Sequence, residues 1–136
     1  MRWSLSRPES VVLAACVAAL AAACFAPPLH QHGHIHDFAD QRLLWGIPCA
    51  LDVLSNLPFA IAGLLGLRVL GRVPAGALPN DQVRLAALFF AGLIVTAAAS
   101  AWYHLRPDDA GLAVDRIGMA VAFAGLLGLL VATQVS

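Results

Sequence analysis

The chain alternates between long apolar runs and short polar segments. Each run is close to the ~20 residues that an α-helix needs to cross a bilayer. The four runs cover residues 11–29, 47–70, 83–103 and 112–135. The segments between them contain the Gly, Pro, Asn and Asp residues that end helices and form turns, and the first of these segments, 30–45, is rich in His. The pattern predicts an all-α, multi-pass transmembrane bundle of about four helices, forming one membrane domain over residues 1–136.

The composition supports a membrane protein. Of the 136 residues, 60% are hydrophobic and only 12% are charged, and the mean hydropathy is +0.80. A soluble domain usually carries roughly twice this charged fraction, so these charges are too few to cover a compact soluble surface. The formal net charge is zero and no basic patch is interleaved with aromatic residues. We therefore expect membrane lipids as partners and no nucleic acid.

The first apolar run, 11–29, has two interpretations. Arg2 and Arg7 precede an apolar stretch that ends in small residues, as in a secretory signal peptide. Lipoprotein cleavage before Cys16 is disfavoured because too few apolar residues precede that position. A retained helix is favoured over a cleaved signal, and both interpretations stay open.

The distribution of arginines predicts the orientation of the chain. Five of the eight arginines flank the first run or the connector between the second and third runs, namely Arg2, Arg7, Arg68, Arg72 and Arg84. The other three are accompanied by several aspartates. This split predicts a cytoplasmic N-terminus. The segments 30–45 and 106–111 would then face outward, towards the periplasm if the chain lies in a bacterial inner membrane.

Three groups of polar side chains lie inside the predicted spans or beside a span end, and an ionisable group costs at least ~2.5–3.5 kcal/mol at mid-membrane. They are Asp52, Ser55 and Asn56 in the second span, Ser100 and His104 in the third, and Asp115 in the fourth. Spacings of three and four residues stack such side chains on one helix face. The start of the second span, the end of the third and the start of the fourth lie on the same membrane side in either orientation. We therefore expect one polar pocket at that side.

Structural roles are an alternative for each of these residues. Ser55, Asn56 and Ser100 can form hydrogen bonds between membrane helices without taking part in any chemistry. Asp52 and Asp115 lie near helix starts, where a carboxylate interacts favourably with the helix dipole. The common depth and side of the group favour a functional pocket.

Three segments resemble the alkaline ceramidase-like membrane hydrolases, which belong to the CREST superfamily with the progestin and adipoQ receptors. They are Ala-Leu-Asp-Val-Leu-Ser-Asn-Leu-Pro at 50–58, Ser-Ala-Trp-Tyr-His at 100–104 and Asp-Arg-Ile-Gly-Met at 115–119. Phe-Ala-Asp-Gln-Arg at 38–42 resembles the sequence that precedes them in bacterial members, and the resemblance covers about 37–124. It implies a seven-helix core, of which this chain would hold the first three helices behind an additional N-terminal helix.

The resemblance implies hydrolysis of the amide bond of a ceramide-like lipid at a zinc site. His104 would be one zinc ligand, Ser100 would donate a hydrogen bond to the reacting carbonyl group, and Asp115 would interact with the metal-bound water. Ser55 and Asn56 match the Ser-Asn pair of the family's first core helix.

The zinc site implied by the resemblance is incomplete in this sequence. A catalytic zinc needs about three protein ligands, and no His follows His104. We expect an N-terminal part or a truncated version of a larger hydrolase, and the sequence leaves open whether this short chain is active. The calcium ligands of the eukaryotic members are not expected, because Cys49 occupies the position of an important acidic residue.

A second candidate metal site is the alternating run of four histidines before Asp37. These are His30, His32, His34 and His36. In an extended strand, such imidazoles could chelate zinc, nickel or copper, and they lie on the same side as His104. The alternative is a solvated loop that binds metal only adventitiously.

Two other functions compete with the hydrolase. A non-enzymatic metal-binding or transport protein would use the His run and Asp52. A structural or receptor-like membrane protein would share the scaffold without its chemistry, because a fold does not determine a function.

Overall fold

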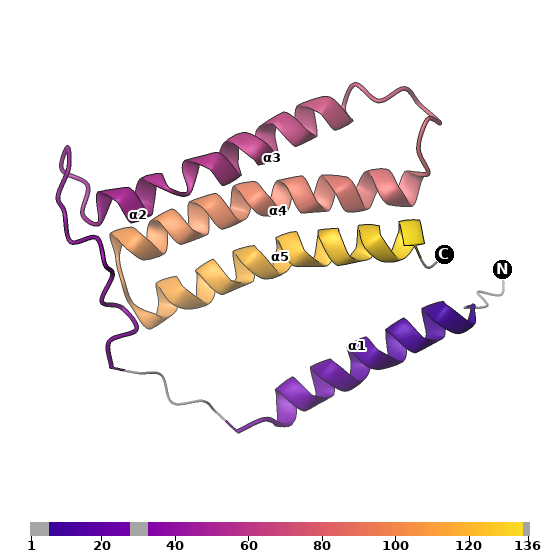
Figure 1. Ribbon diagram of the computed structural model, residues 1–136, viewed down its shortest axis with the longest axis horizontal. Coiled ribbons are helices and arrows are strands. Elements are labelled where there is room, and N and C mark those ends of the chain that lie inside the picture. The colour runs from indigo at the N-terminus through magenta and orange to yellow at the C-terminus, as the bar shows by residue number, and fades with distance from the viewer. Residues whose placement is uncertain (1–5, 28–32, 135–136) are drawn as a thin grey trace.

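The computed structural model describes residues 6–27 and 33–134. Within these ranges the secondary structure consists of five α-helices without a β-strand, which confirms the all-α fold (Figure 1). The helices are α1 (Arg7–Phe25), α2 (Ala50–Leu54), α3 (Leu57–Leu70), α4 (Asn80–Leu105) and α5 (Asp109–Gln134). With α2 and α3 taken together as one span, four helices are long and apolar enough to cross a membrane.

Helix α1 begins with a capping box formed by Ser6 and Glu9. The Ser6 N–H donates to Glu9 Oε2 at 2.7 Å, and the Glu9 N–H donates to Ser6 Oγ at 3.4 Å. This capping box satisfies free N–H groups of the first turn. It starts the helix at Arg7, ahead of the apolar run that the sequence predicted from residue 11, and the helix ends at Phe25. Residues 28–29 of the predicted run lie outside the described residues. None of the residues of α1 is buried within the described part of the chain.

The second span is interrupted between α2 and α3, whereas the sequence analysis treated it as continuous. Pro58 has no N–H and cannot donate to the carbonyl of Leu54, so the helix breaks there. Ser55 Oγ and Asn56 Nδ2 donate to the carbonyl of Asp52 at 2.7 and 3.0 Å. These side chains supply hydrogen-bond donors at a break where a membrane would offer no water.

Helices α4 and α5 pack along a seam of mostly small residues. The buried seam positions are spaced by four and three residues, the spacing of helices that pack side by side. They are Gly92, Thr96, Ala99 and Tyr103 on α4, and Gly111, Asp115, Gly118, Ala122 and Gly125 on α5. A Cβ atom added at Gly92 would lie 2.5 Å from the backbone N of Ala122. Small residues allow this close approach, as is typical of helices in membranes.

Helix α3 packs on another side of α4. A Cβ atom added at Gly63 would lie 2.6 Å from the carbonyl oxygen of Phe90, so the two backbones are in close contact. Both α4 and α5 begin three residues earlier than predicted, because residues 80–82 and 109–111 form their first turns.

The helix directions bring three chain segments to one end of the bundle. The start of α2, the end of α4 and the start of α5 lie there, and the 71–79 connector lies at the opposite end (Figure 1). This arrangement agrees with the common side that the alternation of the spans predicted. We call this end the polar end, because it carries Asp52, His104 and Asp115.

Candidate functional site

Residues 35 and 36 are bound to the polar end through Tyr103. His36 Nδ1 lies 2.9 Å from the Tyr103 hydroxyl, and His36 Nε2 lies 3.2 Å from Asp109 Oδ1. An ionised carboxylate can only accept, so Nε2 carries the hydrogen, and in the neutral ring Nδ1 accepts from Tyr103. The Tyr103 hydroxyl also lies within donating distance, 3.4 Å, of the carbonyl of Ile35. We call residues 33–49 the loop. Tyr103, 5% exposed, connects the loop to α4, and His36 connects it to Asp109 of α5.

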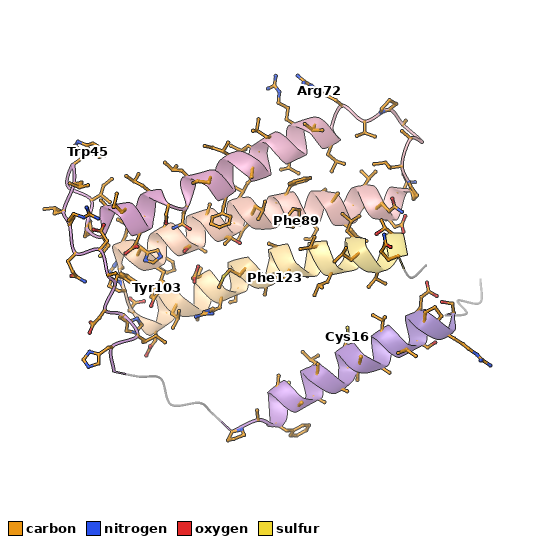
Figure 2. All side chains as sticks on the ribbon, in the orientation of Figure 1. Cys16, Trp45, Arg72, Phe89, Tyr103 and Phe123 are labelled. Atoms are coloured by element: carbon orange, nitrogen blue, oxygen red, sulfur yellow. The ribbon has the colours of Figure 1, made fainter. Side chains whose placement is uncertain are left out.

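Phe38 covers the end of α4. Its ring centroid lies 5.2 Å from that of Tyr103, in an edge-to-face arrangement, and 4.4 Å from that of His104. Figure 2 shows Tyr103 at the polar end, where the loop passes over α4 and α5. The half-buried His104 is therefore covered by an aromatic side chain from the loop.

Asp40 attaches the same loop to α2. Its side chain is 6% exposed and accepts hydrogen bonds from Arg42 Nε at 2.6 Å and from the Leu51 N–H at 2.8 Å. The bond from Arg42, followed by that from Leu51, holds the pKa of the Asp40 carboxyl below its ordinary value of 3.8. Because Leu51 lies in the first turn of α2, Asp40 acts as a cap supplied from outside the helix.

The loop then forms a tight turn before α2. Leu44 and Ile47 exchange backbone hydrogen bonds of 3.1 and 2.9 Å. Cys49 has a φ of 46°, in the left-handed region. Helix α2 therefore begins at Ala50, after the predicted start of the span at residue 47.

Two polar atoms at the polar end are buried without a hydrogen bond among the described residues. They are His104 Nδ1 and Asp52 Oδ2. Leaving such an atom unpaired costs about 1–3 kcal/mol, so these exceptions need an explanation. Both atoms belong to residues that the sequence analysis selected, and both remain available to a ligand.

An apolar cavity lies between α3, α4 and α5, on the side of Ser100 and Asp115 that faces away from the polar end. The cavity has a volume of about 240 Å³ and is lined by Phe59, Phe89, Leu93, Thr96, Met119, Ala122, Phe123 and Leu126. Ser100 follows Thr96 by four residues, His104 follows Ser100 by four, and Asp115 precedes Met119 by four. Spacings of four keep side chains on one helix face. The three polar residues therefore continue the faces that line the cavity, towards the polar end.

The other predicted pocket residues behave differently from one another. Asn56 is buried, whereas Ser55 is exposed, and both side chains bond to the backbone of their own segment. Ser55 and Asn56 directly follow α2, which contains Asp52, and both keep right-handed helical backbone angles. These bonds correspond to a structural role for Ser55 and Asn56.

The described part of the His run forms a turn over residues 33–36. His34, with a 90% exposed side chain, pairs with Asp37 at 2.7 Å, while His36 faces Tyr103 and Asp109. The extended strand that chelation would require is therefore absent from 33–36. His30 and His32 lie outside the described residues, so metal binding by the run stays a prediction.

The described residues do not complete a zinc site. No group of three or more His, Cys, Asp or Glu side chains that could hold a metal ion occurs among residues 6–27 and 33–134. His104 contributes one imidazole with an unpaired Nδ1, whereas zinc in a catalytic site needs about three protein ligands.

Tyr103 and Phe38 are the site residues that the sequence analysis missed. Tyr103 could have been suspected, because a phenol inside a predicted span needs a hydrogen-bond partner. Phe38 gave no such indication, since its contact with His104 depends on the path of the loop.

Comparison with known proteins adds no further assignment. No family model, no curated protein and no solved structure matches this chain.

Proposed function

We propose that this chain is part of a membrane-embedded, zinc-dependent amidase that hydrolyses the amide bond of ceramide-like lipids. The observation that carries the proposal is that Ser100, His104 and Asp115 follow the lining residues of the apolar cavity at helical spacing, towards the polar end. A lipid amide has a polar linkage joined to long apolar chains. Its chemistry therefore matches a polar end that continues into an apolar space.

The proposed roles are those that the resemblance to the alkaline ceramidase-like hydrolases implies. Asp115, 8% exposed in the α4–α5 seam, takes a proton from the attacking water and later delivers it to the leaving amine. Ser100 donates a hydrogen bond to the carbonyl oxygen, where negative charge develops. Asp115 acts in a water-poor environment, where such interactions are stronger than in water.

His104 is the one zinc ligand that the proposal assigns within the described residues. Its Nδ1 is buried and has no hydrogen-bond partner among them, so its lone pair is available. The remaining ligands are assigned to residues outside the described part. We further propose that the polar end faces the periplasmic side of a bacterial inner membrane, because five of the eight arginines flank the N-terminus and the opposite connector.

The test measures ceramide hydrolysis and zinc content of the purified full-length chain in detergent. Asp115→Asn should lower turnover by about 10²–10⁴-fold, the usual contribution of a general base, without changing the zinc content. Asp81→Asn is the matched control, because Asp81 is exposed at the opposite end of the bundle. Full activity in Asp115→Asn would remove Asp115 from the mechanism.

The zinc ligand is tested in the same preparation. His104→Ala should lose zinc, whereas His34→Ala, which changes an exposed histidine, should retain it. Zinc that His104→Ala retains in full, together with hydrolysis that Asp115→Asn leaves unchanged, would contradict the proposed function.

A further inference from the structure

The turn before α2 exposes apolar side chains at the polar end. In this turn, residues 43–47, the Trp45 side chain is 88% exposed and Leu43 is 69% exposed. We call it the Trp45 turn. Trp45 and Leu43 together form an exposed apolar patch on this turn, and such patches can mark membrane interaction sites.

The backbone of the turn holds Trp45 away from the bundle. Leu44 and Ile47 close the turn with two hydrogen bonds, and its two central residues have positive φ, 53° at Trp45 and 80° at Gly46. Asn, Asp and Gly are the residues usually found at the first central position of such a turn. A bulky residue with positive φ is a genuine outlier, and such outliers cluster at functional positions.

The turn lies at the level where the membrane spans end. It projects sideways from the start of α2 at the polar end, and Trp45 lies at its edge (Figures 1 and 2). The span formed by α2 and α3 begins at Ala50. Tryptophan is enriched at membrane–water interfaces, because its ring is apolar and its indole N–H can reach water or lipid carbonyl groups.

Arg42 places a positive charge beside the turn, opposite in sign to a lipid phosphate. Its side chain is 63% exposed, and its Nε donates to Asp40. A guanidinium group has five N–H donors, so the bond to Asp40 leaves several that can bind the phosphate of a lipid headgroup.

From these observations we propose that the Trp45 turn is an interfacial membrane anchor. Trp45 and Leu43 insert into the boundary between headgroups and acyl chains beside α2, and Arg42 binds lipid phosphate. The occupant is the lipid surface itself. The proposal depends on insertion of the spans in a bilayer and does not depend on the amidase function.

The test measures the depth of Trp45 in vesicles by fluorescence quenching. In the Trp3→Phe/Trp102→Phe variant of the full chain, Trp45 is the only tryptophan. The protein is reconstituted in phosphatidylcholine vesicles whose lipids carry a quencher at successive acyl-chain positions. We expect the largest loss of emission with the shallowest quenchers, a blue-shifted maximum and weak quenching by aqueous iodide.

Two references calibrate the measurement. N-acetyltryptophanamide outside the vesicles reports full access to iodide, and the Trp3→Phe/Trp45→Phe variant reports Trp102, which is 42% exposed on α4. If the double variant of the test does not fold, the difference between the wild-type and Trp45→Phe emission spectra isolates the Trp45 emission. Iodide quenching as strong as in the free amide would overturn the proposal in favour of an aqueous loop. Quenching by neither reagent would overturn it in favour of a contact with protein, such as a second copy of this chain.

Discussion

The α4–α5 seam and the polar end are held together by different kinds of interaction. In the seam, small residues bring two backbones into contact, and Thr96 bonds only within its own helix, to the carbonyl of Gly92 at 2.8 Å. At the polar end, hydrogen bonds join segments that are far apart in the chain, such as His36 and Tyr103, 67 residues apart. The seam therefore depends on the size of its residues, whereas the polar end depends on their chemical identity.

This difference separates the scaffold from the candidate site. Changes of size in the seam should disturb the whole bundle, because α4 packs against both α5 and α3. Changes of hydrogen-bonding groups at the polar end should disturb the loop over His104 and leave the helices intact. Two substitutions and a change of pH should affect the two regions differently, and the largest expected effect comes first.

The largest effect is expected from filling the seam. A side chain at Gly125 would collide with the backbone of Phe89, so Gly125→Leu should force α4 and α5 apart and lower the free energy of unfolding by about 3 kcal/mol. Gly33→Leu is the matched control, because a Cβ atom there meets no atom within 4 Å. Unfolding followed by circular dichroism in detergent measures both variants. Equal stability of the two would contradict the close packing of the seam.

A smaller effect is expected from removing one hydroxyl group at the polar end. Tyr103→Phe keeps the ring beneath Phe38 but removes the hydrogen bonds to His36 and Ile35. The loss of about 1 kcal/mol should appear as faster amide hydrogen exchange over residues 34–38, with unchanged exchange in α5. Uniformly faster exchange in both regions would show that the polar end and the seam are not separable.

The smallest effect is expected from acid, and it should be confined to the attachment of the loop to α2. The pKa of Asp40 is lowered in the folded chain, so its stabilising effect is fully present above pH 3.8 and is lost as pH falls through the lowered pKa. Protection of the Leu51 amide from hydrogen exchange should therefore be complete at neutral pH. It should decrease only below pH 3.8, the ordinary pKa of an aspartate. Asp40→Asn should remove this pH dependence. Loss of this protection already near neutral pH would show that the Asp40 carboxylate does not hold the Leu51 amide.

The spans and the common side of the polar residues could be predicted from the sequence. Hydropathy identifies each span because length and apolar character alone decide whether a helix can cross a bilayer. The convergence of Asp52, His104 and Asp115 follows from the alternation of the spans. The break after Leu54 was also predictable in principle, because Pro58 cannot donate to the Leu54 carbonyl.

The loop contacts and the cavity could not be predicted in this way. The bond between His36 and Tyr103 depends on the path of the segment between the first two spans, which no periodicity describes. The cavity beside Thr96 and Met119 depends on the angles at which three helices pack, and these angles are set by close contacts such as that of Gly92 with Ala122. The polar residues could be identified from the sequence, whereas the apolar cavity could not.

Photolabelling can show whether the polar end and the adjacent cavity receive a lipid amide. A ceramide carrying a photoreactive group in its acyl chain is cross-linked to the full chain in vesicles, and the labelled peptides are identified by mass spectrometry. Met119→Trp fills the cavity, and Ile117→Trp, at a position on α5 that is 62% exposed, is its matched control. We expect labelling near Thr96 and Met119 that excess ceramide abolishes, that phosphatidylcholine leaves intact, and that only Met119→Trp prevents. Labelling that phosphatidylcholine displaces equally well, or that Met119→Trp leaves unchanged, would show that the cavity does not receive a lipid amide.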